Sequence, residues 1–170
     1  MSESTQPSLN RVDTAKVADR RILRFESIDQ LMAEVERLVE AERAGRLRCQ
    51  GNWTLGQTLG HLAAWTEYSY TGAPLKVPFF IRWFMWFRKN KFLYGPMRAG
   101  VKIPRVEGGT LATEPMPLEE ALGRMRRVME RLKTEAPTAR SPLFGLLKHQ
   151  EWIALQLRHA ELHLGFLIPQ

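Results

Sequence analysis

The chain has 170 residues, which fits one domain with its own hydrophobic core, and 25 Lys and Arg against 18 Asp and Glu give a formal net charge of +7. A single cysteine, Cys49, excludes an internal disulfide, and we interpret it as incidental rather than catalytic. No apolar run follows a basic start, so no signal peptide is predicted and a cytoplasmic location is expected.

The first part of the chain divides into a tail and a helix. Residues 1–20 are polar and lack apolar periodicity, which predicts a disordered N-terminal tail before a domain of residues 21–170. Ser27 and Gln30 have the spacing of a capping box and open a helix that ends near Gly45. Its apolar residues recur at spacings of three and four: Ile28, Leu31, Met32, Val35, Leu38 and Val39.

A second helix is predicted from residue 55 to about Tyr70. Thr54 and Gln57 form another capping box, and His61 lies beside the apolar stripe. That stripe consists of Leu55, Leu59 and Leu62. Residues 75–116 are interrupted by prolines and by Gly108-Gly109, which predicts an irregular connection with one short helix between Phe79 and Phe92.

Two more helices follow. Pro117 suits the first turn of a third helix that ends before Pro137, and a fourth runs from about His149 to Leu167. The fourth is apolar almost all round, so we expect it to be the most buried. No segment alternates with period two, so no strand is predicted. The pattern indicates an all-α fold, specifically a four-helix bundle with one long irregular connection between helices two and three.

His159 and His163 are the most informative residues, because a spacing of four on a helix brings two imidazoles onto one face. A metal needs a third protein ligand, and His61 is the better candidate because His149, ten residues before His159, falls off that face. We interpret His149 as a solvated residue near a helix start. The alternative is that the paired histidines are hydrogen-bonded core residues.

Three segments carry a family resemblance: Asn52–Ala63, Ser141–Gly145 and Glu151–Leu164. Together they resemble the DinB-like superfamily, and more narrowly a bacterial branch of it whose function is uncharacterised. The resemblance implies a four-helix bundle in which one histidine of the second helix and two of the fourth hold a divalent metal, here His61, His159 and His163. It also implies metal-dependent hydrolases or thiol-dependent transferases, and homodimers.

Helical spacing selects further residues for the surroundings of the site. Gln57 lies one turn before His61, Trp65 and Tyr68 lie one and two turns after it, and Gln156 is three residues before His159. Each is a candidate to hydrogen-bond an imidazole or to line a pocket. For any single residue the simpler interpretation is a core aromatic or a helix cap.

The segment of residues 78–91 is aromatic and basic. Residues 75–106 contain eight Lys and Arg and no Asp or Glu. The apolar run is too short to span a bilayer, which leaves a lid over the site, a subunit interface or a membrane-surface contact. The lid or interface is favoured because no second membrane signal is present. An anionic-ligand or membrane patch would use Arg82, Arg88, Lys89 and Lys91.

The leading hypothesis is therefore a divalent-metal-dependent enzyme that acts on a small-molecule substrate. The metal would be zinc, nickel or iron, a low-molecular-weight thiol is a candidate cosubstrate, and no catalytic residue is assigned. The competing hypothesis is a non-catalytic oligomeric or membrane-surface binding module with structural histidines. Specific nucleic-acid binding is not expected, because no recognised motif accompanies the charge.

Overall fold

The computed structural model describes residues 11–104 and 106–170, and over these residues the fold is mainly helical, as predicted. Its elements, in chain order, are α1 (Ile28–Arg43), β1 (Leu47–Cys49), α2 (Leu55–Thr71), α3 (Phe79–Phe87), α4 (Lys89–Tyr94), a 3-10 turn (Glu107–Gly109), α5 (Leu118–Thr134), α6 (His149–Leu164) and β2 (Leu167–Pro169).

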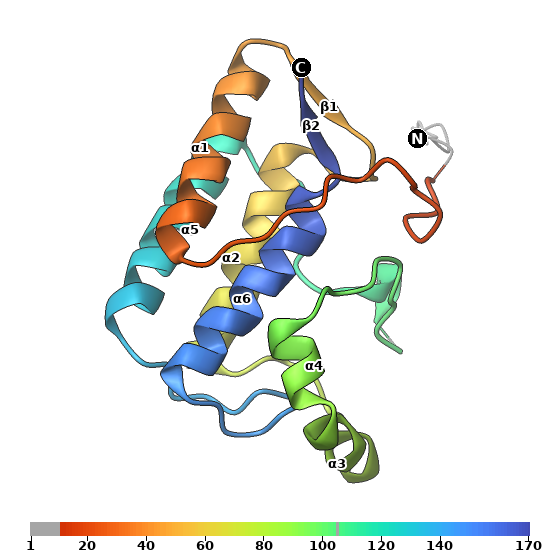
Figure 1. The fold of residues 1–170 in the computed structure, drawn as a ribbon, viewed down its shortest axis with the longest axis vertical. Coiled ribbons are helices and arrows are strands. Elements are labelled where there is room, and N and C mark those ends of the chain that lie inside the picture. The colour runs from red at the N-terminus through yellow and green to blue at the C-terminus, as the bar shows by residue number, and fades with distance from the viewer. Residues whose placement is uncertain (1–10, 105) are drawn as a thin grey trace, which may run out of the picture.

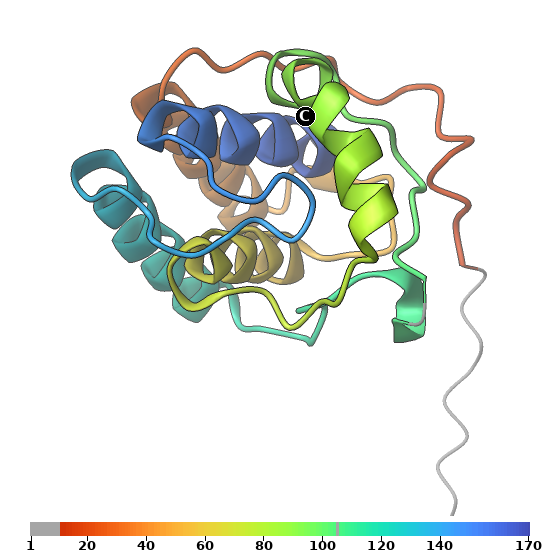
Figure 2. The same cartoon turned by 90° about the horizontal axis from the view of Figure 1, so that it is seen from below.

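The four long helices α1, α2, α5 and α6 surround one apolar core, and α3 and α4 stand to one side of them (Figures 1 and 2). Each long helix contributes a stripe of buried residues at helical spacing, as the sequence predicts. Representative core residues are Leu31, Val35, Leu38, Leu55, Leu59, Leu62, Leu122, Met125, Met129, Trp152, Leu157 and Leu164.

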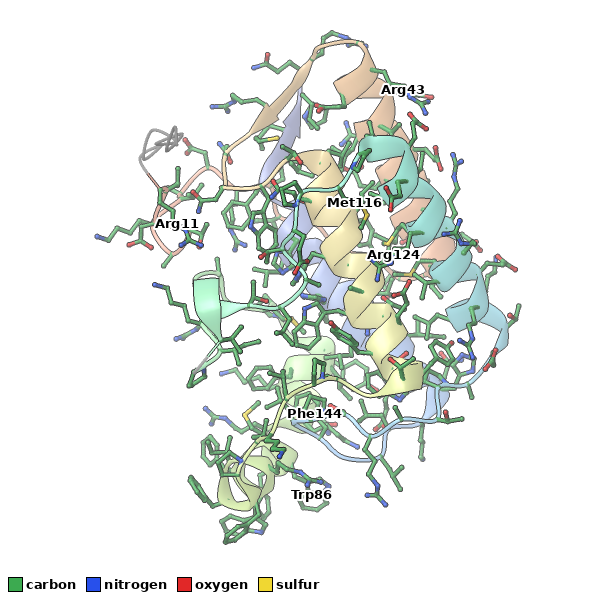
Figure 3. The ribbon with its side chains drawn as sticks, turned by 180° about the vertical axis from the view of Figure 1, so that it is seen from behind. Arg11, Arg43, Trp86, Met116, Arg124 and Phe144 are labelled. Carbon is green, nitrogen blue, oxygen red and sulfur yellow. The ribbon has the colours of Figure 1, made fainter. Side chains whose placement is uncertain are left out.

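α2, rather than α6 as predicted, buries the most residues along its length. Two glycines explain this, because a Cβ at Gly56 would lie 2.3 Å from the Met116 carbonyl oxygen and a Cβ at Gly60 would lie 3.0 Å from the Met116 sulfur. The segment that precedes α5 therefore passes directly over α2, where Met116 lies in Figure 3. α6 is less buried because part of its surface faces a cavity.

The predicted absence of strands was wrong. β1 and β2 form a two-stranded antiparallel sheet in which Leu47 pairs with Pro169 and Cys49 with Leu167. Each strand has three residues, too few to display an alternating pattern. The fourth helix, predicted to reach Leu167, ends at Leu164 because the chain turns at Gly165 into β2.

The connection between α2 and α5 contains two short helices where one was predicted. α4 packs against α6 through buried Leu93 and through an ion pair in which Lys89 Nζ lies 2.6 Å from a Glu151 carboxylate oxygen. α3 has no buried residue and extends away from the body of the molecule, where Figure 3 labels Trp86. The first part of the long connection is therefore attached to the body through α4, and its last part through the segment that crosses α2.

The predicted disordered tail falls partly outside the described residues, which begin at residue 11. Val12 exchanges two backbone-to-amide hydrogen bonds with Asn52, at 2.8 and 2.9 Å. Further along, Arg158 pairs with Glu161 at 2.6 Å, and both side chains also bond the backbone of Phe25. Residues 11–26 thus follow the body of the domain up to the start of α1, and disorder of residues 1–10 stays a prediction.

Candidate functional site

α2 and α6 bring the three predicted histidines together. His61, His159 and His163 each offer one ring nitrogen, and these three atoms lie within 4.8 Å of one another. The Nε2 atoms of His61 and His159 are 3.2 Å apart. Two nitrogens bound tetrahedrally to one zinc, at 2.0–2.1 Å each, would be about 3.3 Å apart. The His61–His159 pair therefore has the spacing of two ligands of a single ion.

A backbone carbonyl sets the tautomer of His61. Its Nδ1 lies 2.9 Å from the Leu111 carbonyl oxygen, which can only accept, so we assign the ring hydrogen to Nδ1. In the neutral ring the Nε2 lone pair then points toward His159. Metal-binding histidines are usually oriented in this way: the ring nitrogen that does not bind the metal donates a hydrogen bond to a neighbouring group. Gly56 and Gly60 make it possible, because they let the segment of residues 111–118 approach α2.

Trp53 is a member of the site that the sequence interpretation did not select. Its ring stacks on His163 with centroids 5.1 Å apart and an angle of 16° between the planes, and it lies 4.8 Å from His61. Trp53 precedes the α2 cap, so helical periodicity gave no indication of its direction. Its position inside the segment that resembles the superfamily was the available signal.

Burial keeps the three imidazoles neutral. It lowers the pKa of His61 to about 4, although hydrogen bonds to the Leu111 and Ala112 backbone act in the opposite direction. The pKa values of His159 and His163 also lie well below the usual value. Burial is the larger cause, and repulsion from the neighbouring imidazoles is the smaller one. Neutral imidazoles are the form that binds divalent metals.

We expect the metal-free protein to lose stability as the pH falls below 6.5. Both states hold neutral histidines above that pH, but below it the unfolded chain gains protons that the folded chain does not take up until about pH 4 at His61. The free energy of unfolding should fall by about 1.4 kcal/mol per pH unit for each such histidine. Urea titrations from pH 7 to 5 measure this; a slope unchanged in His163→Leu would contradict it.

Of the four residues predicted to surround the histidines, three line the cavity beside them and Gln57 does not. Trp65 contacts the rings of His61 and His159 at centroid distances of 6.1 and 5.7 Å, and Tyr68 packs edge-on against Trp65. Buried Gln156 donates to the Trp65 carbonyl oxygen at 3.3 Å. These three residues line the cavity described below. Gln57 instead completes the α2 cap and donates to the Thr113 carbonyl oxygen, because its amide is needed at the helix end.

A large cavity of about 1480 Å³ adjoins the cluster. His159 and His163 form part of its wall, together with Trp53, Trp65 and Trp152. The far side is formed by α3, α4 and the connection that follows them. That side is basic, with Arg88, Lys91, Arg98 and Lys102 among the lining residues; Lys89, also predicted for the basic patch, is held by Glu151 instead.

Two residues outside the cluster have local roles. His149 was predicted to be solvated, but it is half-buried and its Nε2 lies 2.6 Å from the Leu132 carbonyl oxygen, because the start of α6 packs against the end of α5. Exposed Cys49 lies on β1, where desolvation and Glu42 raise the pKa of its thiol. A raised thiol pKa disfavours the nucleophilic thiolate, in line with an incidental role.

The fold and the site together define a mainly helical protein with a three-histidine cluster that opens into a large cavity. The chain belongs to the family described as "Protein of unknown function (DUF1569)", whose model matches residues 17–170. Comparison with curated proteins and with solved structures gave no match. No helix among the described residues is long and apolar enough to cross a membrane.

Proposed function

We propose that this chain is a divalent-metal-dependent enzyme in which His61, His159 and His163 hold the metal. The observation that carries the proposal is the convergence of three neutral imidazole nitrogens within 4.8 Å at the wall of a cavity. Three imidazoles suit zinc, nickel or iron and leave a coordination position for a substrate or water. A metal there would supply a Lewis acid that lowers the pKa of a water or thiol.

The surroundings favour an enzyme site over structural histidines. The core is formed by apolar stripes from four helices, so the fold does not depend on the histidines for its packing. His159 and His163 face a cavity rather than the core. We also propose that the four long helices form a bundle of the DinB-like kind and that the chain is a homodimer. The proposed location is the cytoplasm, where exposed Cys49 remains reduced.

Of the two expected reaction types, the cavity favours a thiol-dependent transferase. Its volume exceeds the 300–1,000 Å³ usual for one small ligand, so it has room for a thiol and an acceptor together. Arg98 and Lys102 in its wall can bind the carboxylates of a thiol such as glutathione. Asp13 is the one carboxylate among the described wall residues, so a hydrolase would have few candidates for a general base.

An activity assay tests the proposal. The chain is stripped with a chelator, reloaded with zinc, nickel or iron, and given glutathione with an aryl halide, or a nitrophenyl ester without thiol. We expect metal-dependent thiol consumption that His61→Ala abolishes. Ester hydrolysis without thiol would identify a hydrolase instead. If the metal is retained stoichiometrically but both reactions stay at background, the histidines are structural and the enzyme proposal is wrong.

A further inference from the structure

The surface of α3 is the largest feature that the proposed function leaves without a role. Its apolar side chains are exposed, with Phe79 at 82%, Trp83 at 67% and Phe87 at 62%. Phe80, Phe84 and Trp86 are each more than half exposed as well. Soluble proteins rarely expose contiguous aromatic patches of this kind unless another surface covers them. Within the part of the molecule that the structure describes, no residue of α3 is buried by the rest of the chain.

The aromatic residues share the outward face of α3. At about 100° per residue, the six aromatic side chains fall within an arc of about 160°. Ile81 and Met85 point the other way and line the cavity. α3 therefore has an inner face that closes part of the cavity and an outer face that the described residues leave exposed. Figure 3 shows Trp86 at the end of the molecule, away from the long helices.

Positive charge surrounds this aromatic face. Arg82 lies on α3, and the Arg88 guanidinium lies 5.5 Å from the centre of the Phe84 ring. Lys76 and Lys91, on either side of the helix in sequence, are exposed. Lys89 is not counted, because Glu151 pairs with it. Residues 75–106 contain no Asp or Glu that could neutralise these cations.

We propose that α3 (the aromatic helix Phe79–Phe87) and its flanking cations dock the protein on anionic lipid membranes, with α3 lying in the plane of the interface. Trp favours the headgroup region, where its ring is half in contact with hydrocarbon, and exposed Lys and Arg reach anionic headgroups. Nine residues of helix measure about 14 Å, less than half of the hydrocarbon thickness, so α3 enters one leaflet only.

The charge distribution favours a membrane over a second copy of the chain. A symmetric dimer through α3 would bring Arg82, Arg88 and Lys91 of both copies together, with no acidic residue of the same segment to pair with them. An anionic bilayer offers the opposite charge at the same depth as the aromatic rings. Because α3 also lines the cavity, docking would place the cavity beside the lipid surface.

Vesicle sedimentation of the full-length chain tests this inference. We expect binding to phosphatidylcholine vesicles that contain about 30 mol% phosphatidylserine, weak binding without it, and release by salt. Trp83→Ser with Trp86→Ser should weaken binding about tenfold. Ile22→Ser removes a fully exposed apolar side chain elsewhere and should leave binding unchanged.

A second pair of variants tests the charge. Arg88→Gln with Lys91→Gln should reduce binding about tenfold, whereas Arg48→Gln with Arg127→Gln removes the same net charge outside the segment and should have a smaller effect. Absence of binding by the parent, or binding that the α3 variants leave intact, overturns the inference. If the parent is a dimer that W83S/W86S dissociates, and the parent does not bind vesicles, then a second copy of the chain covers α3. Metal-free protein should bind equally, which separates this test from that of the enzyme proposal.

Discussion

His159→Ala is expected to abolish stoichiometric metal binding. The proposed site has three protein ligands whose rings are nearly equally spaced, and the substitution removes one whose ring centroid lies 5.1 Å from that of His61 and 4.7 Å from that of His163. Loss of a residue that merely orients a ligand already costs about 10–100-fold in metal affinity. Loss of a ligand itself should cost more. Elemental analysis by mass spectrometry after chelation, reloading and desalting measures the metal per chain.

His149→Ala is the matched control, because His149 is another half-buried histidine of α6 that binds a backbone carbonyl and lies outside the cluster. It should retain the metal fully. Thermal unfolding of both variants shows whether the fold persists, and added metal should raise the midpoint of the parent and of His149→Ala only. Equal metal content in His159→Ala and the parent would contradict the three-histidine site.

The histidine cluster was predictable because each ligand lies on a regular helix. Spacing placed His159 and His163 on one face and made His61 a better third ligand than His149, and the resemblance implied the same three residues; the full capping box at Thr54 also formed as predicted. Residues outside helices were harder. The direction of Trp53 and the approach of the Leu111 carbonyl depend on irregular segments, in which no periodicity relates sequence to side-chain direction.

Part of the missing information was present in the sequence in another form. Gly56 and Gly60 lie four residues apart inside a helix, where each costs about 1 kcal/mol relative to alanine. Such a pair indicates that another segment passes close to that face, although it does not say which segment. The exposure of α3 was unpredictable for a different reason: an apolar pattern indicates that a helix needs a partner, but the partner need not belong to the same chain.

Gly56→Ala is expected to destabilise the protein by about 3 kcal/mol, the upper range for overpacking a filled site. Helix propensity alone would favour alanine by about 1 kcal/mol. The contact decides the sign, because the new Cβ would lie 2.3 Å from the Met116 carbonyl oxygen, a backbone atom that no change of rotamer can move. Displacement of that segment also moves the Leu111 carbonyl away from His61, so metal affinity should fall together with stability.

Gly123→Ala on α5 is the control, because its Cβ would meet only the end of the flexible Arg127 side chain, at 3.5 Å. It should be neutral or stabilising by up to about 1 kcal/mol. Gly60→Ala distinguishes a clash with the Met116 side chain from a clash with its backbone, because the new Cβ would meet the Met116 sulfur at 3.0 Å. Met116→Ala should therefore rescue Gly60→Ala, but it should not rescue Gly56→Ala, which clashes with the Met116 carbonyl oxygen. Urea unfolding measures the parent, the three glycine variants and the two double variants with Met116→Ala. Parent-like stability of Gly56→Ala would mean that the segment before α5 does not rest on the glycine face of α2, and the account of how His61 is oriented would be wrong with it.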